Sequence, residues 1–144
     1  MVNHPLEFGV KFIAAHMALS YEPIRIFKAL STNPKNFNQD YFTLLEMLNQ
    51  HDNLYADISA ILTPVRAKVL PHLSEQYQVH DKLLFGTDYP VPFSTVFTSY
   101  DLPYKKRFEL AKIDNPFDRY TESILEYFNE DSPIFQNYKK VLTL

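Results

Sequence analysis

The sequence contains no cysteine and no tryptophan, and it has only 2 glycines against 10 prolines. Without cysteine the chain forms neither disulfides nor thiolate metal sites, so a bound metal must be held by histidine and carboxylate side chains. Neither Gly9 nor Gly86 is placed to open a helix, which excludes the glycine-rich loops that bind nucleotide phosphates. The sequence also has no apolar run near the roughly 20 residues of a membrane span and no signal pattern after Met1. We therefore expect no membrane partner and a cytoplasmic location.

The composition is otherwise that of an ordinary globular domain. The chain has 144 residues, of which 46% are hydrophobic and 22% are charged, and this suits a single domain spanning residues 1–144. The net charge is -3, and the 14 Lys and Arg residues are scattered except at Lys105-Lys106-Arg107. A nucleic-acid surface needs clustered positive charge to bind the phosphate backbone. We therefore expect no nucleic-acid partner.

Three short apolar runs are predicted to form strands. They cover residues 10–16, 53–59 and 83–87, and two prolines at positions 90 and 92 prevent the last run from continuing as a helix. The segments between the runs are long enough to carry a helix back over a sheet, so the strands are predicted to be parallel. The predicted fold class is therefore α/β.

Helices are predicted in both connections and after the last strand. The first connection is predicted to hold a short helix around residues 24–30 and a longer one that begins with Asp40 as its N-cap. The second is predicted to hold a helix over residues 64–73, with His72 facing solvent. After the last strand we expect a long loop and then three helices, with the loop at residues 91–103 and the helices at 104–112, 118–129 and 133–142.

A polar residue lies at the end of each predicted strand: His16, Ser59 and Asp88. Because the carboxyl ends of parallel strands meet at one edge of a sheet, these side chains are expected to lie where α/β proteins place their chemistry. Small residues two positions earlier, Ala14 and Gly86, leave space beside His16 and Asp88. The alternatives are a core histidine bonded to a backbone carbonyl and an aspartate that caps the turn before the prolines.

Two kinds of catalytic site fit these residue types. A Ser-His-Asp triad would use Ser59, His16 and Asp88, but the nucleophile elbow of hydrolases places its serine between glycines. Here the local sequence is Ile58-Ser59-Ala60. A metal site suits a histidine and an aspartate better, although a catalytic zinc normally takes three protein ligands.

Three motifs resemble consecutive strands of one enzyme family. Residues 12–16 (FIAAH), 53–59 (NLYADIS) and 83–90 (LLFGTDYP) resemble the sixth, seventh and eighth strand motifs of the amidohydrolase-related (amidohydrolase 2) TIM-barrel hydrolases and decarboxylases. The match in order and spacing covers about residues 8–92, and the eighth-strand motif is the most specific. The resemblance implies a partial (β/α)8 TIM barrel of about strands 6 to 8. The alternative is a small open parallel α/β sheet.

The resemblance also implies roles for individual residues. Asp88 stands at the position that binds the catalytic divalent metal, expected to be Zn²⁺, and that takes a proton from water. His16 stands at the position that polarises or protonates the substrate. We further expect Ser59 and Tyr89 to contact a small-molecule substrate. Family members have glycines after the histidine where this chain has Met17-Ala18-Leu19, so the adjoining loop differs.

The family's other metal ligands are missing from the sequence. A His-x-His pair on the first strand and a histidine on the fifth should precede His16, but only fifteen residues do. A complete barrel needs about 250 residues, so the chain resembles the C-terminal portion of one, as a truncated gene product, a cloned fragment or one half of a split protein. We expect a metal-dependent hydrolase or decarboxylase that is incomplete and poorly active alone. The alternative is a non-catalytic remnant or interaction module that retains the βα fold.

Strands taken from a barrel are expected to leave an open surface. Two sheet edges lose their neighbours, and the uncovered inner face is predicted to carry Phe12, Ala14, Tyr55 and Leu84. Such a surface is expected to pair with a missing N-terminal half-barrel or with a second copy of the chain in a two-fold dimer. The alternative is that the last helices fold over the open side.

Overall fold

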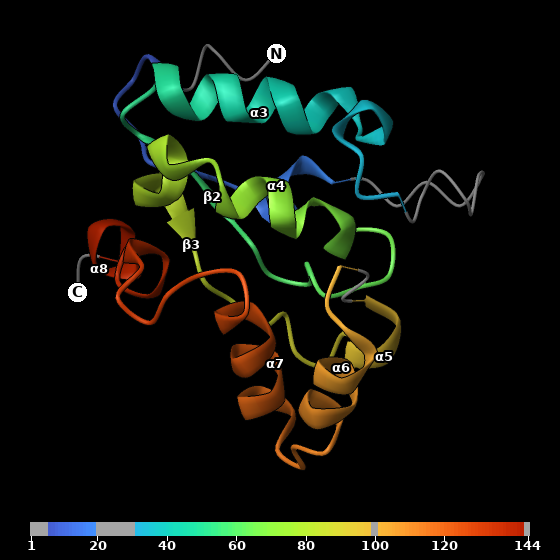
Figure 1. The fold of residues 1–144 in the computed structure, drawn as a ribbon. Helices are drawn as coiled ribbons and strands as arrows, with labels where there is room; N and C mark the ends of the chain where they lie inside the picture. The colour runs from blue at the N-terminus through green and yellow to red at the C-terminus, as the bar shows by residue number, and fades with distance from the viewer. Residues whose placement is uncertain (1–5, 20–30, 99–100, 143–144) are drawn as a thin grey trace.

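The fold is built on a small parallel sheet. The structure is a computed structural model that describes residues 6–19, 31–98 and 101–142. Its strands are β1 (Phe12–Ala14), β2 (Leu54–Asp57) and β3 (Leu83–Leu84), in the spatial order β1-β2-β3 (Figure 1). Both neighbouring pairs are parallel. The α/β class, the parallel direction and the small open sheet are therefore confirmed.

The strands are shorter than the apolar runs that predicted them. β1 ends because the backbone of His16 and Met17 turns left-handed, with φ of 53° and 55°, inside the 3-10 helix η1 (Ala15–Ala18). β3 has only two paired residues because β2 itself turns away after Asp57, through the left-handed residue Ala60 (φ 50°). Each strand therefore ends earlier than its apolar run predicts, and the chain then enters a turn at the carboxyl edge of the sheet.

The first crossover contains helix α3 (Gln39–Gln50), which packs against β2 and η1. Its buried side chains recur at helical spacing and are Tyr41, Leu44, Leu45 and Leu48. The N-cap is Asn38, whose side chain accepts a hydrogen bond from the amide of Asp40. The predicted Asp40 cap is wrong, because Asp40 lies in the first turn, where its charge suits the helix dipole. The helix predicted around residues 24–30 lies outside the described residues.

The second crossover is built from short helices instead of the single helix predicted over residues 64–73. They are η3 (Ala67–Val69), α4 (Leu70–Ser74) and η4 (Tyr77–Lys82). Pro71 lies in the first turn of α4, where a residue needs no amide partner, so this proline begins a helix. His72 does not face solvent as predicted. It is half-buried, and its Nδ1 shares a hydrogen bond of 2.9 Å with the hydroxyl of Tyr41 on α3.

The C-terminal part of the chain forms a separate group of helices. Helices α5 (Thr95–Thr98), α6 (Tyr104–Ala111) and α7 (Pro116–Leu125) lie together at the end of the molecule away from α3 (Figure 1). The loop predicted over residues 91–103 thus contains a helical turn. Two short helices follow where one was predicted, η5 (Pro133–Phe135) and α8 (Tyr138–Val141). No described helix combines the length and the apolar character needed to cross a membrane.

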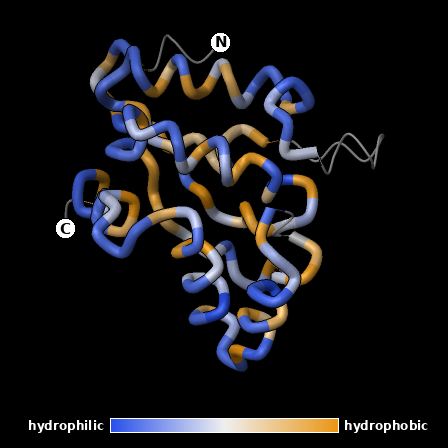
Figure 2. The backbone as a smooth tube through the Cα atoms, viewed as in Figure 1, coloured by the Kyte–Doolittle hydropathy of each residue, from blue (hydrophilic) through white to orange (hydrophobic). Residues whose placement is uncertain are grey.

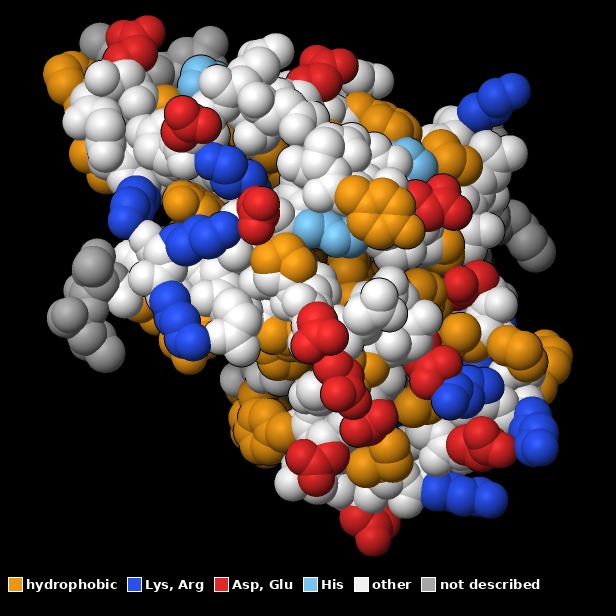
Figure 3. Space-filling model, turned by 60° about the vertical axis from the view of Figure 1, so that its left-hand side comes forward, with side chains coloured by type: hydrophobic (Ala, Val, Ile, Leu, Met, Phe, Trp, Pro, Cys, Tyr) orange, Lys and Arg blue, Asp and Glu red, His pale blue; other side chains and the backbone are white. Residues whose placement is uncertain are grey.

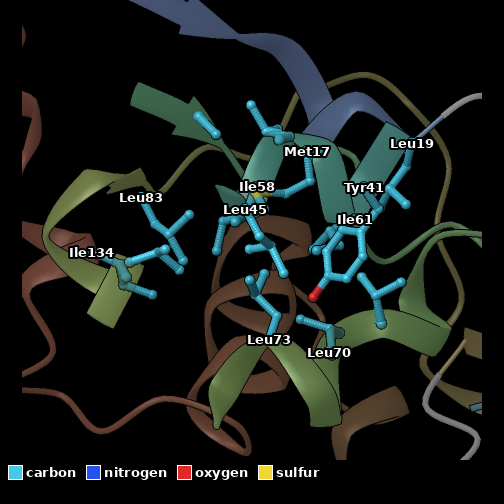
Figure 4. Packing of buried hydrophobic residues seen from close by; sticks show 14 of the residues in the cluster. Met17, Leu19, Tyr41, Leu45, Ile58, Ile61, Leu70, Leu73, Leu83 and Ile134 are labelled. Carbon is cyan, nitrogen blue, oxygen red and sulfur yellow. The ribbon is translucent and has the colours of Figure 1, made fainter. Parts of the chain in front are cut away.

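The core lies between the sheet and the helices α3 and α4 (Figure 4), and Figure 2 shows hydrophobic positions concentrated on the central strands. The register pairs Ile13 with Tyr55, so these two residues share a face, and their neighbours on each strand face the opposite side. Phe12 and Ala14 therefore pack toward the core, while Tyr55 and Leu84 lie on the other face. The prediction that these four residues share one face is wrong, because packing of the helix-covered face sets the register.

The two edges of the sheet differ. Along β3, the amide of Phe85 donates to the carbonyl of Ile134 at 3.1 Å, and the side chain of Asn137 donates to the carbonyl of Leu83 at 2.8 Å. The segment after α7 therefore covers this edge. At the β1 edge no described strand pairs, and Ile13 is 46% exposed. Among the described residues, the β1 edge is thus the one that no other segment pairs with.

Candidate functional site

The structure brings His16, Ser59 and Asp88 to one edge of the sheet, where their positions after parallel strands predict them. His16 follows β1, Ser59 follows β2 and Asp88 follows β3. Nε2 of His16 lies 3.7 Å from Oδ2 of Asp88. On the other side of the ring, Nδ1 lies 2.9 Å from the hydroxyl oxygen of Ser59. The three residues therefore form one cluster centred on His16.

Hydrogen bonds on one side of the His16 ring define where its proton lies. Nδ1 lies 3.0 Å from the carbonyl oxygen of Ser59 and 2.9 Å from its hydroxyl oxygen. A carbonyl oxygen only accepts, so Nδ1 carries the hydrogen. In the neutral ring Nε2 then offers a lone pair, and this lone pair faces the carboxylate of Asp88.

Asp57 is a site residue that the sequence analysis did not single out. Its Oδ1 accepts hydrogen bonds from the amide of His16 at 3.1 Å and from the amide of Ser59 at 3.0 Å, and the hydroxyl of Ser59 also donates to it. One carboxylate oxygen thus ties the end of β1 to the end of β2. The position of Asp57 in the sequence indicates this role, because Asp57 lies two positions before Ser59 and therefore on the same face of the strand by alternation.

The same hydrogen bonds argue against a Ser-His-Asp triad. In a triad the histidine accepts the serine proton on one ring nitrogen, while a carboxylate holds the N–H on the other side of the ring. Here the hydroxyl of Ser59 donates to Asp57, and the nitrogen beside it already carries a hydrogen. Ser59 is also buried, with 9% of its surface exposed. The hydroxyl therefore positions His16 and is not arranged as a nucleophile.

Each of the three turns at the cluster contains a residue with left-handed backbone geometry. The φ angles are 53° at His16, 50° at Ala60 and 58° at Asp88. This geometry costs a residue with a side chain roughly 1–2 kcal/mol. Residues held in it cluster at active sites and ligand-binding turns, where surrounding contacts stabilise them. The hydrogen bonds of Asp57 supply such contacts for the turn at His16.

Gly86 lets the segment after β3 approach Ser59. A Cβ atom at position 86 would lie 3.3 Å from the Cβ of Ser59, which is closer than ordinary van der Waals contact. The sequence predicts open space beside Asp88 at this point. The structure shows that the side chain of Ser59 takes up that space.

Tyr120 on α7 holds the turn that carries Ser59. Its ring is buried, and its hydroxyl donates to the carbonyl of Ile58 at 3.3 Å. Burial raises the pKa of Tyr120 far above its usual value. The hydroxyl therefore stays protonated and remains a donor, which links the C-terminal helices to the end of β2.

A pocket of about 380 Å³ opens beside His16 and Asp88. Its walls combine apolar and polar side chains: His16, Thr63, Pro64, Arg66, Asp88, Val91 and Pro92. Arg66 is held at the wall by a hydrogen bond from Nε to the carbonyl of Leu19 at 3.2 Å. The volume lies within the range of small-molecule sites.

The two predicted substrate contacts lie outside the walls of this pocket. Ser59 is buried against His16 and is not among the lining residues. Tyr89 is 64% exposed, and its ring packs on that of Phe117 with a centroid distance of 5.0 Å. The lining residues that the sequence did not single out include Thr63 and Arg66, which lie in the second crossover between β2 and η3.

The capacity of the site for a metal ion is limited. Nε2 of His16 and the carboxylate of Asp88 offer two donor groups that face each other. Among the described residues, no group of three or more histidine, aspartate or glutamate side chains is placed to hold an ion. The described residues therefore place two such groups at this point of the site.

Comparisons of the chain with protein-family models, with curated proteins and with solved structures found no match in any of the three. The assignment of a function therefore rests on the geometry of the site.

Proposed function

We propose that this chain is the C-terminal part of a metal-dependent hydrolase of the amidohydrolase-related type, corresponding to about strands 6 to 8 of a TIM barrel. The observation that carries the proposal is the pairing of His16 and Asp88. Nε2 and Oδ2 both offer lone pairs and lie 3.7 Å apart. Two acceptors that face each other are stabilised by a proton or a cation between them.

The distance between the two atoms favours a shared ion. At 3.7 Å the pair is longer than a hydrogen bond, and an ion with bonds of about 2.1 Å can reach both atoms. Histidines that bind metals usually donate their other ring N–H to a carbonyl or a carboxylate. His16 has this arrangement, because its Nδ1 hydrogen is directed at the carbonyl of Ser59.

The residues present fit part of a metal site. A catalytic zinc takes three protein ligands, and His16 and Asp88 account for two. In the family that the sequence resembles, the remaining ligands come from the first and fifth strands, which precede the three strand motifs matched here. The proposal therefore predicts a weak metal site and poor activity for the chain alone, and a complete site once a missing half-barrel is added.

A divalent ion held there, expected to be Zn²⁺, would supply Lewis acidity for the attack of water on a polarised substrate. Asp88 would accept the proton that water loses. His16 would polarise or protonate the substrate only as the imidazolium, in which Nε2 carries a proton, and would bind the ion through the Nε2 lone pair in the neutral form. The pocket walls at Thr63, Arg66 and Val91 would hold a small organic molecule next to this pair.

The second candidate is a non-catalytic remnant or interaction module. Two observations favour it: the described residues supply no third metal ligand, and the β1 edge is open to another strand. In that case the hydrogen bonds around Asp57 stabilise a fold whose catalytic part is absent.

Zinc titration by isothermal calorimetry separates the two candidates. The proposal predicts one zinc ion per chain, with affinity reduced about ten-fold or more by both Asp88→Asn and His16→Asn. Asp114→Asn is the matched control, because this exposed aspartate lies far along the chain from the cluster and lines no part of the pocket. The absence of saturable zinc binding, or equal losses in all three variants, would support the remnant.

A further inference from the structure

A second pocket lies on a different part of the molecule, between η4 and the segment that follows α7. It has a volume of about 330 Å³. Its walls are Ser74, Tyr77, His80, Tyr127, Phe128, Asn129, Asp131, Ser132 and Pro133. None of these residues lines the pocket at His16 and Asp88. The two pockets therefore require separate explanations.

Aromatic rings form much of this second wall. The rings of Tyr77 and His80 lie 5.3 Å apart, and the rings of His80 and Phe128 lie 5.2 Å apart. Tyr127 adds a further ring to the lining. Tyr77 is 77% exposed although it is a large ring. The face of an aromatic ring carries partial negative charge, so a pocket with several rings attracts positive charge.

Three polar groups of the wall can accept a hydrogen bond or balance positive charge. His80 donates its Nε2 hydrogen to the carbonyl of Leu73 at 3.2 Å, which leaves a lone pair on Nδ1 of the neutral ring. The hydroxyl of Ser132 is buried and has no hydrogen-bond partner among the described residues. Asp131 adds a full negative charge, and none of the described residues that line the pocket is a lysine or an arginine.

Acidic side chains also gather on the surface of the molecule. Figure 3 shows a run of acidic side chains down the lower middle of one face of the molecule, with lysines and arginines toward its two sides. Glu130 stands next to Asp131 in the sequence, and both are exposed. An anion entering the pocket would meet the charge of Asp131, and none of the described lining residues is a lysine or an arginine that could offset it.

We propose that this pocket binds a small organic ammonium ion, either quaternary or alkyl. Such an ion combines positive charge with an apolar surface, and both properties match aromatic walls beside a carboxylate. Tyr77 and Phe128 contact the apolar groups around the nitrogen, and Asp131 balances the charge. The site does not depend on the proposed hydrolase, because it shares no residue with His16 and Asp88.

A nuclear magnetic resonance titration with two matched probes tests the proposal. The probes are choline and 3,3-dimethylbutan-1-ol, which has a similar shape but no charge. We expect choline to shift the amide signals of Tyr77, Phe128 and Ser132 in a saturable manner, and the alcohol to bind at least several-fold more weakly. Equal responses to the two probes would show that the pocket selects only apolar bulk, and would overturn the assignment.

Paired variants test which side chains contribute to the binding of choline. Tyr77→Ala should weaken choline binding roughly 2- to 30-fold, the range of a cation–π contact, whereas Tyr77→Phe keeps the ring and should retain most of the affinity. Asp131→Asn should also weaken binding, and more than Glu130→Gln, which removes the same charge from a residue outside the lining. A short peptide with a trimethylated lysine tests whether the ammonium belongs to a protein. No saturable shift with choline or the peptide, or no effect of Tyr77→Ala, would refute the proposal.

Discussion

Replacing Asp57 with alanine tests whether one carboxylate holds the carboxyl edge of the sheet together. The change leaves three donors without their acceptor, namely the amides of His16 and Ser59 and the hydroxyl of Ser59. A hydrogen bond to a charged group contributes about 1.5–3 kcal/mol when it is shielded from water. The side chain of Asp57 is 23% exposed, so water replaces part of each bond. We therefore expect a loss of about 1 kcal/mol per donor, or about 3 kcal/mol in total.

Urea denaturation followed by circular dichroism measures this loss as a change in the free energy of unfolding. Asp57→Asn keeps an oxygen acceptor for the two amides and should cost only about 1 kcal/mol. Asp114→Ala removes an exposed carboxylate and serves as the control, with a change within about 0.5 kcal/mol. If Asp57→Ala also falls within about 0.5 kcal/mol of the unmodified chain, the carboxylate does not stabilise the turns as argued.

A second measurement reports on the His16 ring directly. In the unmodified chain, nitrogen chemical shifts should show the neutral ring protonated on Nδ1, because this atom faces the carbonyl of Ser59. In Asp57→Ala the hydroxyl of Ser59 loses its acceptor and becomes free to donate to Nδ1. We then expect a larger share of the ring protonated on Nε2. If Asp57→Ala is clearly destabilised but the His16 ring stays protonated on Nδ1, then Asp57 stabilises the turns without controlling the protonation of the ring.

Three further predictions concern catalysis, pH and assembly. In a barrel complemented with its missing half, Asp88→Asn should abolish hydrolysis and keep the circular dichroism spectrum. In that complete site His16→Asn should lower kcat more than zinc affinity, because the added histidines would hold the ion without it, unlike in the chain alone; an equal loss of zinc would make His16 an essential ligand of the complete site. Burial lowers the pKa of His72, and the nearby charge of Glu75 offsets part of this shift. The unfolded chain therefore binds the proton more readily than the folded chain, and the free energy of unfolding should fall as the pH drops below about 6.5. Denaturation at about pH 7.5 and about pH 5.5 should show this slope, and His72→Gln should reduce it. The chain should also self-associate at micromolar concentration through its β1 edge, which a sedimentation mass near 16.9 kDa would contradict.

The parts of the fold that follow from local pattern and connection length could be predicted. Three apolar runs separated by long connections leave few choices other than parallel strands, and parallel strands place His16, Ser59 and Asp88 at one edge. Asp57 was missed because its role depends on two amides, one of which belongs to a residue 41 positions away. In the sequence such an aspartate looks like any residue that ends a strand before a turn.

Two of the errors share one physical origin, which is contact between residues far apart in the chain. The sequence predicts that His72 faces solvent, yet the hydroxyl of Tyr41 from the first crossover bonds to it. The faces of β1 were misjudged because the register against Tyr55 is set by packing and not by the pattern of β1 itself. The error over the helix cap has a local origin instead, because Asn and Asp both suit an N-cap and residues 38 and 40 both offer one.

The covered β3 edge limits how a barrel could be completed around this chain. In a closed barrel every strand pairs on both sides, so β3 would need a further strand along its outer edge. The amide of Phe85 there is already bonded to Ile134, and the carbonyl of Leu83 accepts from Asn137. The β1 edge has no such obstacle, because no described strand pairs with it and Ile13 is exposed. A missing half-barrel would therefore join first at β1, and the barrel would close only if the segment after α7 gave up its hydrogen bonds to β3.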